Sequence, residues 1–288
     1  MSKVENCRIS EQESGQKLIS YLKRKMGRDF PDSGLMRLIR TGQVRINKRR
    51  CKPFQRISTD DIVRIPPHQN TQKVDVLNKE PIIIIFENQD FLVLEKPAGI
   101  TVHSGTKQID TLVSRVHSNF QETEFKPTPV HRLDKDTSGV ILFAKSYSWL
   151  LRMHGIWNTP DLKKVYLTWV EGSWQDQGLE MRDKIEKKYH KVCIEEQGKI
   201  ALSKVDCLVT GTDFSLLKIA ISTGRTHQIR LQLAKGGFPS LEIKNMEMAH
   251  NMDRQCFFIV TKFPGQSMTL CFFHAGRVNS RFPKTCPD

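Results

Sequence analysis

The fold of this 288-residue chain is decided by the stretch His131-Arg132-Leu133-Asp134-Lys135-Asp136-Thr137-Ser138-Gly139. A short apolar run over 140–144 follows it, which is typical of a buried strand. Asp134 lies between Arg132 and Lys135, so its carboxylate should stay ionised. The hydroxyl groups and the glycine at the end of the stretch can satisfy local backbone groups. From the residues alone, an ordinary polar turn before a core strand is the simpler interpretation, and a turn that presents a reactive carboxylate is the alternative.

Three further segments surround this turn in the sequence. Upstream, residues 91–103 are F-L-V-L-E-K-P-A-G-I-T-V-H, and the strand-like run 82–86 precedes them across a polar turn at 87–90. Downstream, residues 163–167 are K-K-V-Y-L, and residues 223–230 are T-G-R-T-H-Q-I-R. A helix is expected from Ser146 to about Trp157.

Together, these four segments resemble the signatures of RluA-type pseudouridine synthases, in the family's order and over about residues 82–236. They resemble most the branch that modifies large-subunit ribosomal RNA. The resemblance implies an α+β fold, with a catalytic domain over 81–288 built on a long, bent, mostly antiparallel sheet. It further implies the isomerisation of uridine to pseudouridine at specific sites in RNA. That reaction involves no redox change and no external energy source, so no cofactor is implied.

The resemblance also implies roles for individual side chains. Asp134 matches the catalytic aspartate, and Arg225 matches the arginine that pairs with it and keeps it charged. Tyr166 matches the residue that stacks on the uracil and takes part in moving the C5 proton. Arg132 matches the arginine that takes the place of the flipped-out nucleotide, and Ile229 matches an apolar wall of the pocket. Structural roles are expected for four other residues of these motifs: Lys96, His103, His131 and His227.

The positive charge of the chain is concentrated near its N-terminus. The whole sequence has 45 Lys and Arg against 31 Asp and Glu, a net charge of +14. Residues 1–67 contain 16 of these cations and seven of these anions, a net charge of +9, which leaves +5 for the remainder. Such a local surplus makes a polyanion the expected partner.

Residues 12–67 have the pattern of a small separate module, followed by a linker over 68–80. Apolar stripes predict one helix around 18–22 and a second over 35–39, which begins near Pro31 and ends at Gly42. Strands are predicted over 44–47 and 62–65, with a turn at 47–49. The pattern resembles the RNA-binding module named after ribosomal protein S-four, in which the second helix and the next strand meet the RNA. By spacing alone, a solvated basic face is an equal alternative. The residues expected to contact RNA are Arg37, Arg40, Arg45, Lys48, Arg49 and Arg50.

Several other classes of protein are excluded by composition. No apolar run approaches the roughly 20 residues that span a bilayer, and the first residues lack the apolar region of a secretory signal. The seven cysteines are odd in number and scattered, without a C-x-x-C pair, and no H-E-x-x-H motif is present. We therefore expect reduced thiols, no metal, no membrane partner and a cytoplasmic location. We also expect a monomer.

The sequence departs from the family pattern after Pro239. The Gly-Asp pair and the nearby Tyr-Gly of the family are replaced by S-L-E-I-K-N-M-E at 240–247. We expect altered packing of the predicted C-terminal strands, 257–260 and 270–273, with the chemistry retained. A catalytically silent RNA-binding or ribosome-assembly factor that keeps the fold is the main alternative. A hydrolase of glycosidic bonds is a weaker one, because it needs two carboxylates about 5–10 Å apart and only Asp136 is a candidate for the second.

Overall fold

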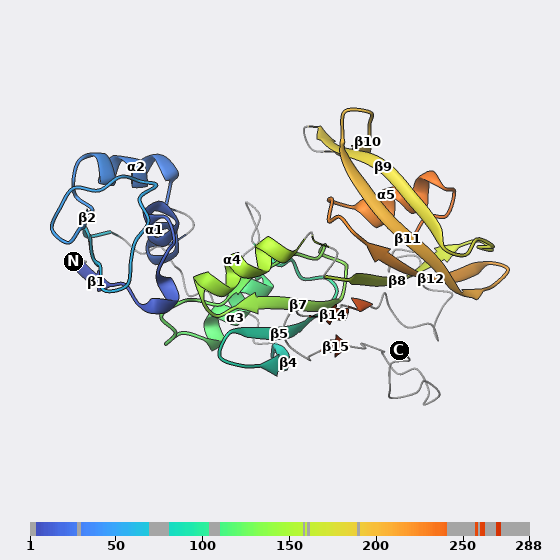
Figure 1. Ribbon diagram of the computed structural model, residues 1–288, viewed down its shortest axis with the longest axis horizontal. Coiled ribbons are helices and arrows are strands. Elements are labelled where there is room, and N and C mark those ends of the chain that lie inside the picture. The colour runs from blue at the N-terminus through green and yellow to red at the C-terminus, as the bar shows by residue number, and fades with distance from the viewer. Residues whose placement is uncertain are drawn as a thin grey trace. The chain divides into compact units, whose positions relative to one another are not determined.

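The computed structural model describes residues 4–27, 30–68, 81–103, 110–157, 159, 162–188 and 191–240, with short strands between 257 and 271 (Figure 1). Its contacts divide into two compact units. The first comprises residues 1–92, 103–130 and 142–152, and the second comprises 93–102, 131–141 and 153–288. The expected domain boundaries stay predictions, and most of the expected linker, residues 69–80, lies outside the described residues.

The N-terminal part of the first unit, residues 4–68, combines two helices with a small antiparallel sheet. The helices are α1 (Leu18–Met26) and α2 (Asp32–Arg40), after the single-turn helix η1 (Glu11–Glu13). The sheet has the order β1-β3-β2, formed by β1 (Glu5–Arg8), β2 (Arg45–Ile46) and β3 (Ile62–Ile65). The stripes that predicted the helices are buried in one core, whose members include Leu18, Leu22, Leu35, Ile39 and Val63.

A tight turn after β2 has the conformation that its sequence favours. Asn47 and Lys48 have φ angles of 49° and 66°, and Asn is one of the residues that tolerates this left-handed region well. The Asn47 side chain accepts a hydrogen bond from the Ile62 backbone N–H at 2.8 Å and donates one to Asp61 at 2.8 Å. These bonds fix the turn and leave Lys48 and Arg49 exposed to solvent.

A second sheet has the strand order β4-β5-β7-β6. Its strands are β4 (Ile83–Glu87), β5 (Phe91–Lys96), β6 (Thr128–Pro129) and β7 (Gly139–Ala144). Every residue of β7 is buried, as the apolar run predicts. The turn between β4 and β5 forms because the Asn88 side chain accepts hydrogen bonds from the backbone N–H groups of Asp90 and Phe91, both at 2.9 Å. Helices α3 (Leu112–Asn119) and α4 (Tyr147–Ile156) complete this region.

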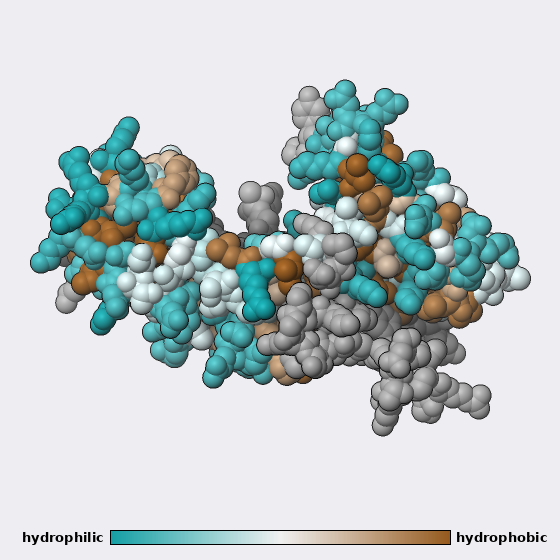
Figure 2. Space-filling model, viewed as in Figure 1, coloured by the Kyte–Doolittle hydropathy of each residue, from teal (hydrophilic) through white to brown (hydrophobic). Residues whose placement is uncertain are grey.

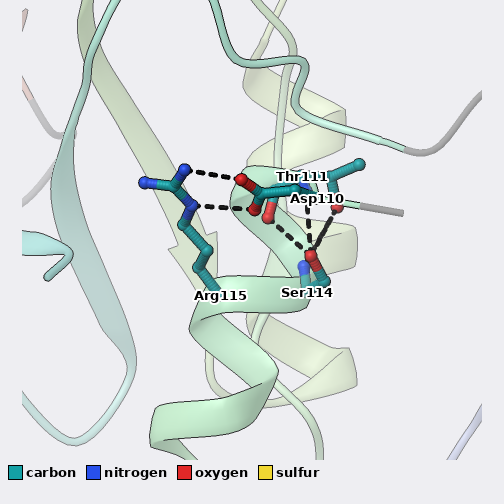
Figure 3. A network of polar contacts seen from close by, with 4 residues as sticks. All are labelled: Asp110, Thr111, Ser114 and Arg115. Atoms are coloured by element: carbon teal, nitrogen blue, oxygen red, sulfur yellow. Dashed lines mark hydrogen bonds and ion pairs between the residues drawn. The ribbon is translucent and has the colours of Figure 1, made fainter. Parts of the chain in front are cut away.

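A network of short polar contacts fixes the start of α3 (Figure 3). The Thr111 hydroxyl accepts from the Ser114 backbone N–H at 3.1 Å, and the Ser114 hydroxyl accepts from the Thr111 backbone N–H at 2.9 Å. This reciprocal pair is a capping box, which satisfies two N–H groups that the helix leaves without partners. Beside it, Arg115 donates two hydrogen bonds to Asp110, at 2.9 and 2.6 Å, and these bonds lower the pKa of the Asp110 carboxyl.

The largest sheet has six strands in the order β10-β9-β11-β12-β8-β13, and all its pairs are antiparallel. Its strands are β8 (Lys164–Glu171), β9 (Leu179–Lys188), β10 (Lys191–Ile194), β11 (Lys199–Thr210), β12 (Phe214–Ile221) and β13 (Phe257–Phe258). Helix α5 (Gln228–Lys235) follows β12, and its Leu233 is buried with Val205, Leu217 and Ile219 of the sheet. A separate antiparallel pair joins β14 (Val260–Lys262) to β15 (Thr269–Cys271).

The mixture of helices and antiparallel sheets agrees with the predicted α+β class. In the described part of the chain, the strands after residue 81 form separate sheets of six, four and two strands, where one long sheet was expected. Most of the stretch that replaces the family's Gly-Asp pair, residues 241–247, lies outside the described residues. Among the described helices, none is both long and apolar enough to cross a membrane.

Candidate active site

A cavity of about 150 Å³ lies within the second unit. Its lining comes from the turn before β7, from β8, from the end of β12, and from residues 224–230, which include the start of α5. The fold thus gathers around one hollow every residue to which the sequence assigned catalysis or substrate contact: Arg132, Asp134, Tyr166, Arg225 and Ile229.

A buried lysine, Lys96, binds the backbone of the turn that carries Asp134. Lys96, at the end of β5, has no exposed surface. Its ammonium group donates hydrogen bonds to the backbone carbonyls of Pro97 at 2.9 Å, Lys135 at 2.9 Å and Thr137 at 2.7 Å. Burial lowers the pKa of Lys96 to about 8, and the nearby carboxylates, Asp136 above all, oppose this shift. The side chain therefore binds the backbone on both sides of Asp136.

Asp134 itself meets a histidine. The His227 Nδ1 lies 2.8 Å from the Asp134 Oδ2, and the two side chains are 41% and 25% exposed. His227 immediately precedes α5 and has a left-handed backbone, with φ 54° and ψ 25°. A carboxylate accepts hydrogen bonds and does not donate them, so Nδ1 carries the proton in this contact.

Tyr166 lies on β8, opposite Ile219 of β12 and Phe257 of β13 in the strand register. Burial raises the pKa of its phenol, and the negative charge of Asp134 raises this pKa further. The phenol is therefore protonated at neutral pH. The contribution of Asp134 to its pKa shows that the two groups interact electrostatically.

Arg225 makes different contacts from the one expected. Its Nε donates to the Ile200 carbonyl at 3.0 Å, and its backbone N–H donates to the Gln228 side chain at 3.1 Å. Among the ion pairs of the described residues, Asp134 is paired with His227 and not with Arg225. The expected pairing is thus not present here, because the guanidinium is tied to β11 while the imidazole lies against the carboxylate. Arg225 nevertheless lines the same cavity.

The basic residues expected to contact RNA lie in the N-terminal part of the first unit. They come from α2, β2 and the turn after β2, and all six are exposed. Arg45 is also held locally, because its Nε donates to the Gly42 carbonyl at 3.1 Å. Within the described residues, no group of three or more His, Cys, Asp or Glu side chains has the arrangement of a metal site.

Residues 90–235 match the family model described as RNA pseudouridylate synthase. This chain belongs to that family. Relatives named "Ribosomal large subunit pseudouridine synthase C" align over most of its length. The one from Haemophilus influenzae is 36% identical over 83% of this chain and 77% of its own length. The one from Pasteurella multocida is 32% identical over 98% and 87%, and the one from Escherichia coli is 30% identical over 96% and 88%.

Solved structures show the same pseudouridine synthase fold. The human protein "RNA Pseudouridylate Synthase Domain Containing 1" superposes with a TM-score of 0.52, at 22% identity, over 67% of this chain and 83% of its own. The human protein "RNA Pseudouridylate Synthase Domain Containing 4" does so with a TM-score of 0.50, at 16% identity, over 62% and 84%. At these identities the likeness concerns the fold.

One residue of this synthase was not singled out from the sequence, although its motif was. Gln228 is 3% exposed, and its side-chain oxygen accepts from the Thr223 hydroxyl at 2.8 Å and the Arg225 backbone N–H at 3.1 Å. Its amide donates to the Leu202 carbonyl and the Ser203 hydroxyl. Gln228 thus ties the T-G-R-T-H-Q segment to β11. The signal was its place inside that motif, but only the structure reveals that it is buried.

Proposed function

We propose that this chain converts uridine to pseudouridine in large-subunit ribosomal RNA, with Asp134 as its catalytic residue. The observation that carries the proposal is the convergence of the family's motif residues on one cavity that contains the Asp134 carboxylate. The large ribosomal subunit as substrate is supported by the names of the relatives, whose own lengths this chain covers to 77–88% in the three cited.

The reaction breaks the bond between N1 of uracil and C1′ of ribose, rotates the base, and joins C5 to C1′. The hydrogen on C5 is lost and N1 gains one, so atoms balance without a redox partner. An ionised carboxylate beside the glycosidic bond serves every version of this chemistry, whether it attacks the sugar, attacks the base or removes a proton. Asp134 lines the cavity and its side chain is 25% exposed, so a substrate can reach the carboxyl group.

Tyr166 is suited to hold the uracil ring. Its aromatic face provides a stacking surface, and its protonated phenol is a hydrogen-bond donor at neutral pH. Because burial and the Asp134 charge both disfavour the phenolate, the phenol begins the reaction neutral. A neutral phenol orients the base first, and it takes part in proton movement only together with another group.

Arg132 provides the means to keep the target nucleotide out of its helix. It is exposed on the turn and, like Asp134, lines the cavity. A stacked base must be flipped before chemistry at its glycosidic bond, at a cost of a few kcal/mol. A guanidinium that fills the vacated space and binds phosphate recovers part of this cost.

We further propose that residues 12–67 form an RNA-binding module of the S-four type. Its support is the pair of helices packed on a small sheet, with six exposed cations on α2, β2 and the turn after β2. Figure 2 shows hydrophilic side chains over much of this part of the molecule. Contacts from these cations to phosphate would add affinity that depends on salt and not on sequence.

The proposed activity is tested on transcribed large-subunit ribosomal RNA, with pseudouridine mapped by carbodiimide treatment and primer extension. We expect product with the wild type and none with Asp134→Asn. Asp136→Asn is the matched control, because it removes a carboxylate two residues away on the same turn and should retain activity. Absence of product with the wild type, while RNA binding persists, would contradict the proposal and favour a silent binding factor. Loss with Asp136→Asn as well as Asp134→Asn would instead indicate a paired-carboxylate mechanism.

The proposed module is tested by the salt dependence of RNA binding. Arg37→Gln and Arg40→Gln should each reduce the slope of log K against log salt by about 0.7–0.9 if each cation neutralises one phosphate. Arg8→Gln is the control. Arg8, on β1, already forms an ion pair with Asp60 at 2.8 Å, so we expect its replacement to leave the slope unchanged. Equal slopes for all three variants would contradict the assignment of this face.

A cytoplasmic location follows from this substrate, because the enzyme must meet ribosomal RNA. Fractionation of cells that produce the protein tests this, and light scattering of the purified chain tests the expected monomer.

A further inference from the structure

His227 adopts a left-handed backbone conformation, and its side chain makes no local hydrogen bond that would offset the cost. Left-handed φ and ψ values cost a residue other than Gly of order 1 kcal/mol, and such residues persist only where their surroundings impose them. His227 is the N-cap position of α5, yet its side chain makes no capping hydrogen bond. Local helix stability therefore does not explain a histidine at this position.

The next residue, Gln228, fixes the start of α5 instead. Gln228 accepts from the Arg225 backbone N–H and bonds to β11, as described above. The His227 carbonyl starts the helix by accepting from the Leu231 N–H at 3.0 Å, which any residue could do. The imidazole is 41% exposed, so it is not a core side chain either.

The left-handed conformation has one visible consequence, which is the direction of the imidazole. It places Nδ1 at 2.8 Å from Oδ2 of Asp134, across 93 residues of sequence. This contact engages one oxygen of the carboxylate and leaves Oδ1 out of it. Arg132, Arg225 and Arg230 line the same cavity, and Tyr166 lines it too. A carboxylate can rotate about its side-chain bonds unless a fixed donor holds one oxygen.

We propose that His227 is the positioning residue of Asp134, and that its Nδ1–H holds Oδ2 so that Oδ1 faces the glycosidic bond. This inference rests on the proposed catalytic role of Asp134. It gives to the imidazole the orienting role that the family resemblance implied for Arg225. Both the neutral Nδ1–H tautomer and the imidazolium can donate this bond, so the contact does not depend on the charge of the ring.

Three substitutions of His227 distinguish the contribution of Nδ1 from that of the rest of the side chain. His227→Asn places an amide N–H near the position of Nδ1, and Asn tolerates the left-handed backbone. His227→Gln places its amide near the position of Nε2 instead. His227→Gly removes the side chain and also relieves the backbone strain, so its fold should be at least as stable as that of the wild type.

The assay is single-turnover release of tritium from ribosomal RNA labelled at C5 of uridine, because C5 loses its hydrogen as pseudouridine forms. We expect His227→Gln and His227→Gly to lower the saturating rate constant about 10- to 100-fold, the factor that one charge-assisted hydrogen bond is worth. The RNA concentration at half-saturation should not change. His227→Asn should stay within about threefold of the wild type, and free imidazole should restore part of the rate to His227→Gly.

Wild-type rates in His227→Gln and His227→Gly would overturn the proposal, and so would an Asn variant as slow as the Gln variant. A change confined to half-saturation would also overturn it, because it would mean a role in RNA binding. Nitrogen NMR of labelled histidine gives a test that is independent of activity. The His227 Nδ1–H signal should be present in the wild type and shift in Asp134→Asn, and absence of that shift would overturn the contact. Failure of the wild type to release tritium would instead contradict the proposed function.

Discussion

Lys96→Met removes the ammonium group that supports the turn of Asp134, while it keeps a side chain of similar length. In the wild type this group is fully buried and donates to the carbonyls of Pro97, Lys135 and Thr137 at 2.7–2.9 Å. The methionine fills the same space and donates no hydrogen bond. The carbonyls of Pro97 and Thr137 then lose this donor, whereas the Lys135 carbonyl keeps a hydrogen bond from the Gly99 backbone N–H at 2.9 Å. The turn before β7 loses the group that connects its two sides.

The magnitude follows from two opposing effects. A carbonyl left without its donor costs about 1–3 kcal/mol, so the carbonyls of Pro97 and Thr137 together cost about 4 kcal/mol. The pKa of Lys96 is lowered from its usual 10.5 to about 8, and since one pKa unit corresponds to about 1.4 kcal/mol, the buried charge costs about 3 kcal/mol. The substitution removes that cost. We therefore expect the free energy of unfolding to fall by about 1 kcal/mol at pH 7.

The same numbers set the pH dependence. The pKa of Lys96 is lower in the folded protein than in the unfolded chain, so between pH 8 and 10.5 the unfolded chain binds more protons. The contribution of this group to stability therefore rises with pH through that window. The methionine variant lacks the titration, so the difference in stability between wild type and variant should grow by up to about 3 kcal/mol from pH 8 to 10.5.

Urea unfolding of the full chain, followed at several pH values from 7 to 10.5, measures both quantities. Lys135→Met is the matched control, because that side chain is exposed and only its backbone carbonyl receives the Lys96 bond. We expect the control to stay within about 0.5 kcal/mol of the wild type. Equal stability of the two variants, or a difference that does not change with pH, would refute the role given to the buried ammonium.

Three further predictions concern the first unit. Thr111→Ala removes the capping box of α3 and should lower the free energy of unfolding by about 1 kcal/mol, measured by urea unfolding. Asp110→Asn should destabilise the protein at pH 7 and have no effect near pH 2. A carboxylate with a lowered pKa stabilises the fold only above that pKa, and thermal unfolding at both pH values measures the difference. Arg24→Met should cost about 1 kcal/mol, because the guanidinium lies 4.7 Å from the Phe125 ring and 5.9 Å from the Tyr147 ring, and unchanged urea unfolding would contradict this estimate.

Much of the local structure could be predicted because it depends on neighbours in the sequence. The stripes around Leu18 and Leu35 predicted α1 and α2, since a helix needs one apolar face to pack. The apolar run after Gly139 predicted a strand that proves buried at every position. Asn47 predicted its turn because its side chain supports a left-handed backbone.

The division of the strands among separate sheets could not be predicted in the same way. One long sheet was expected, whereas the described strands after residue 81 form separate sheets. Strand pairing depends on which segments meet, and alternation along one strand does not specify its neighbour.

The sequence by itself predicted a set of side chains that meet at one cavity. The order and spacing of its motifs identified Asp134, Tyr166 and Arg225, and all three line one cavity. Only the tertiary structure decided which group meets the carboxylate. A motif fixes residue types along the chain, but the partner of Asp134 depends on the backbone angles at His227 and on β11, which binds the guanidinium of Arg225. Neither can be deduced from sequence spacing, because hydrogen bonds depend on distances and directions between segments that are far apart along the chain.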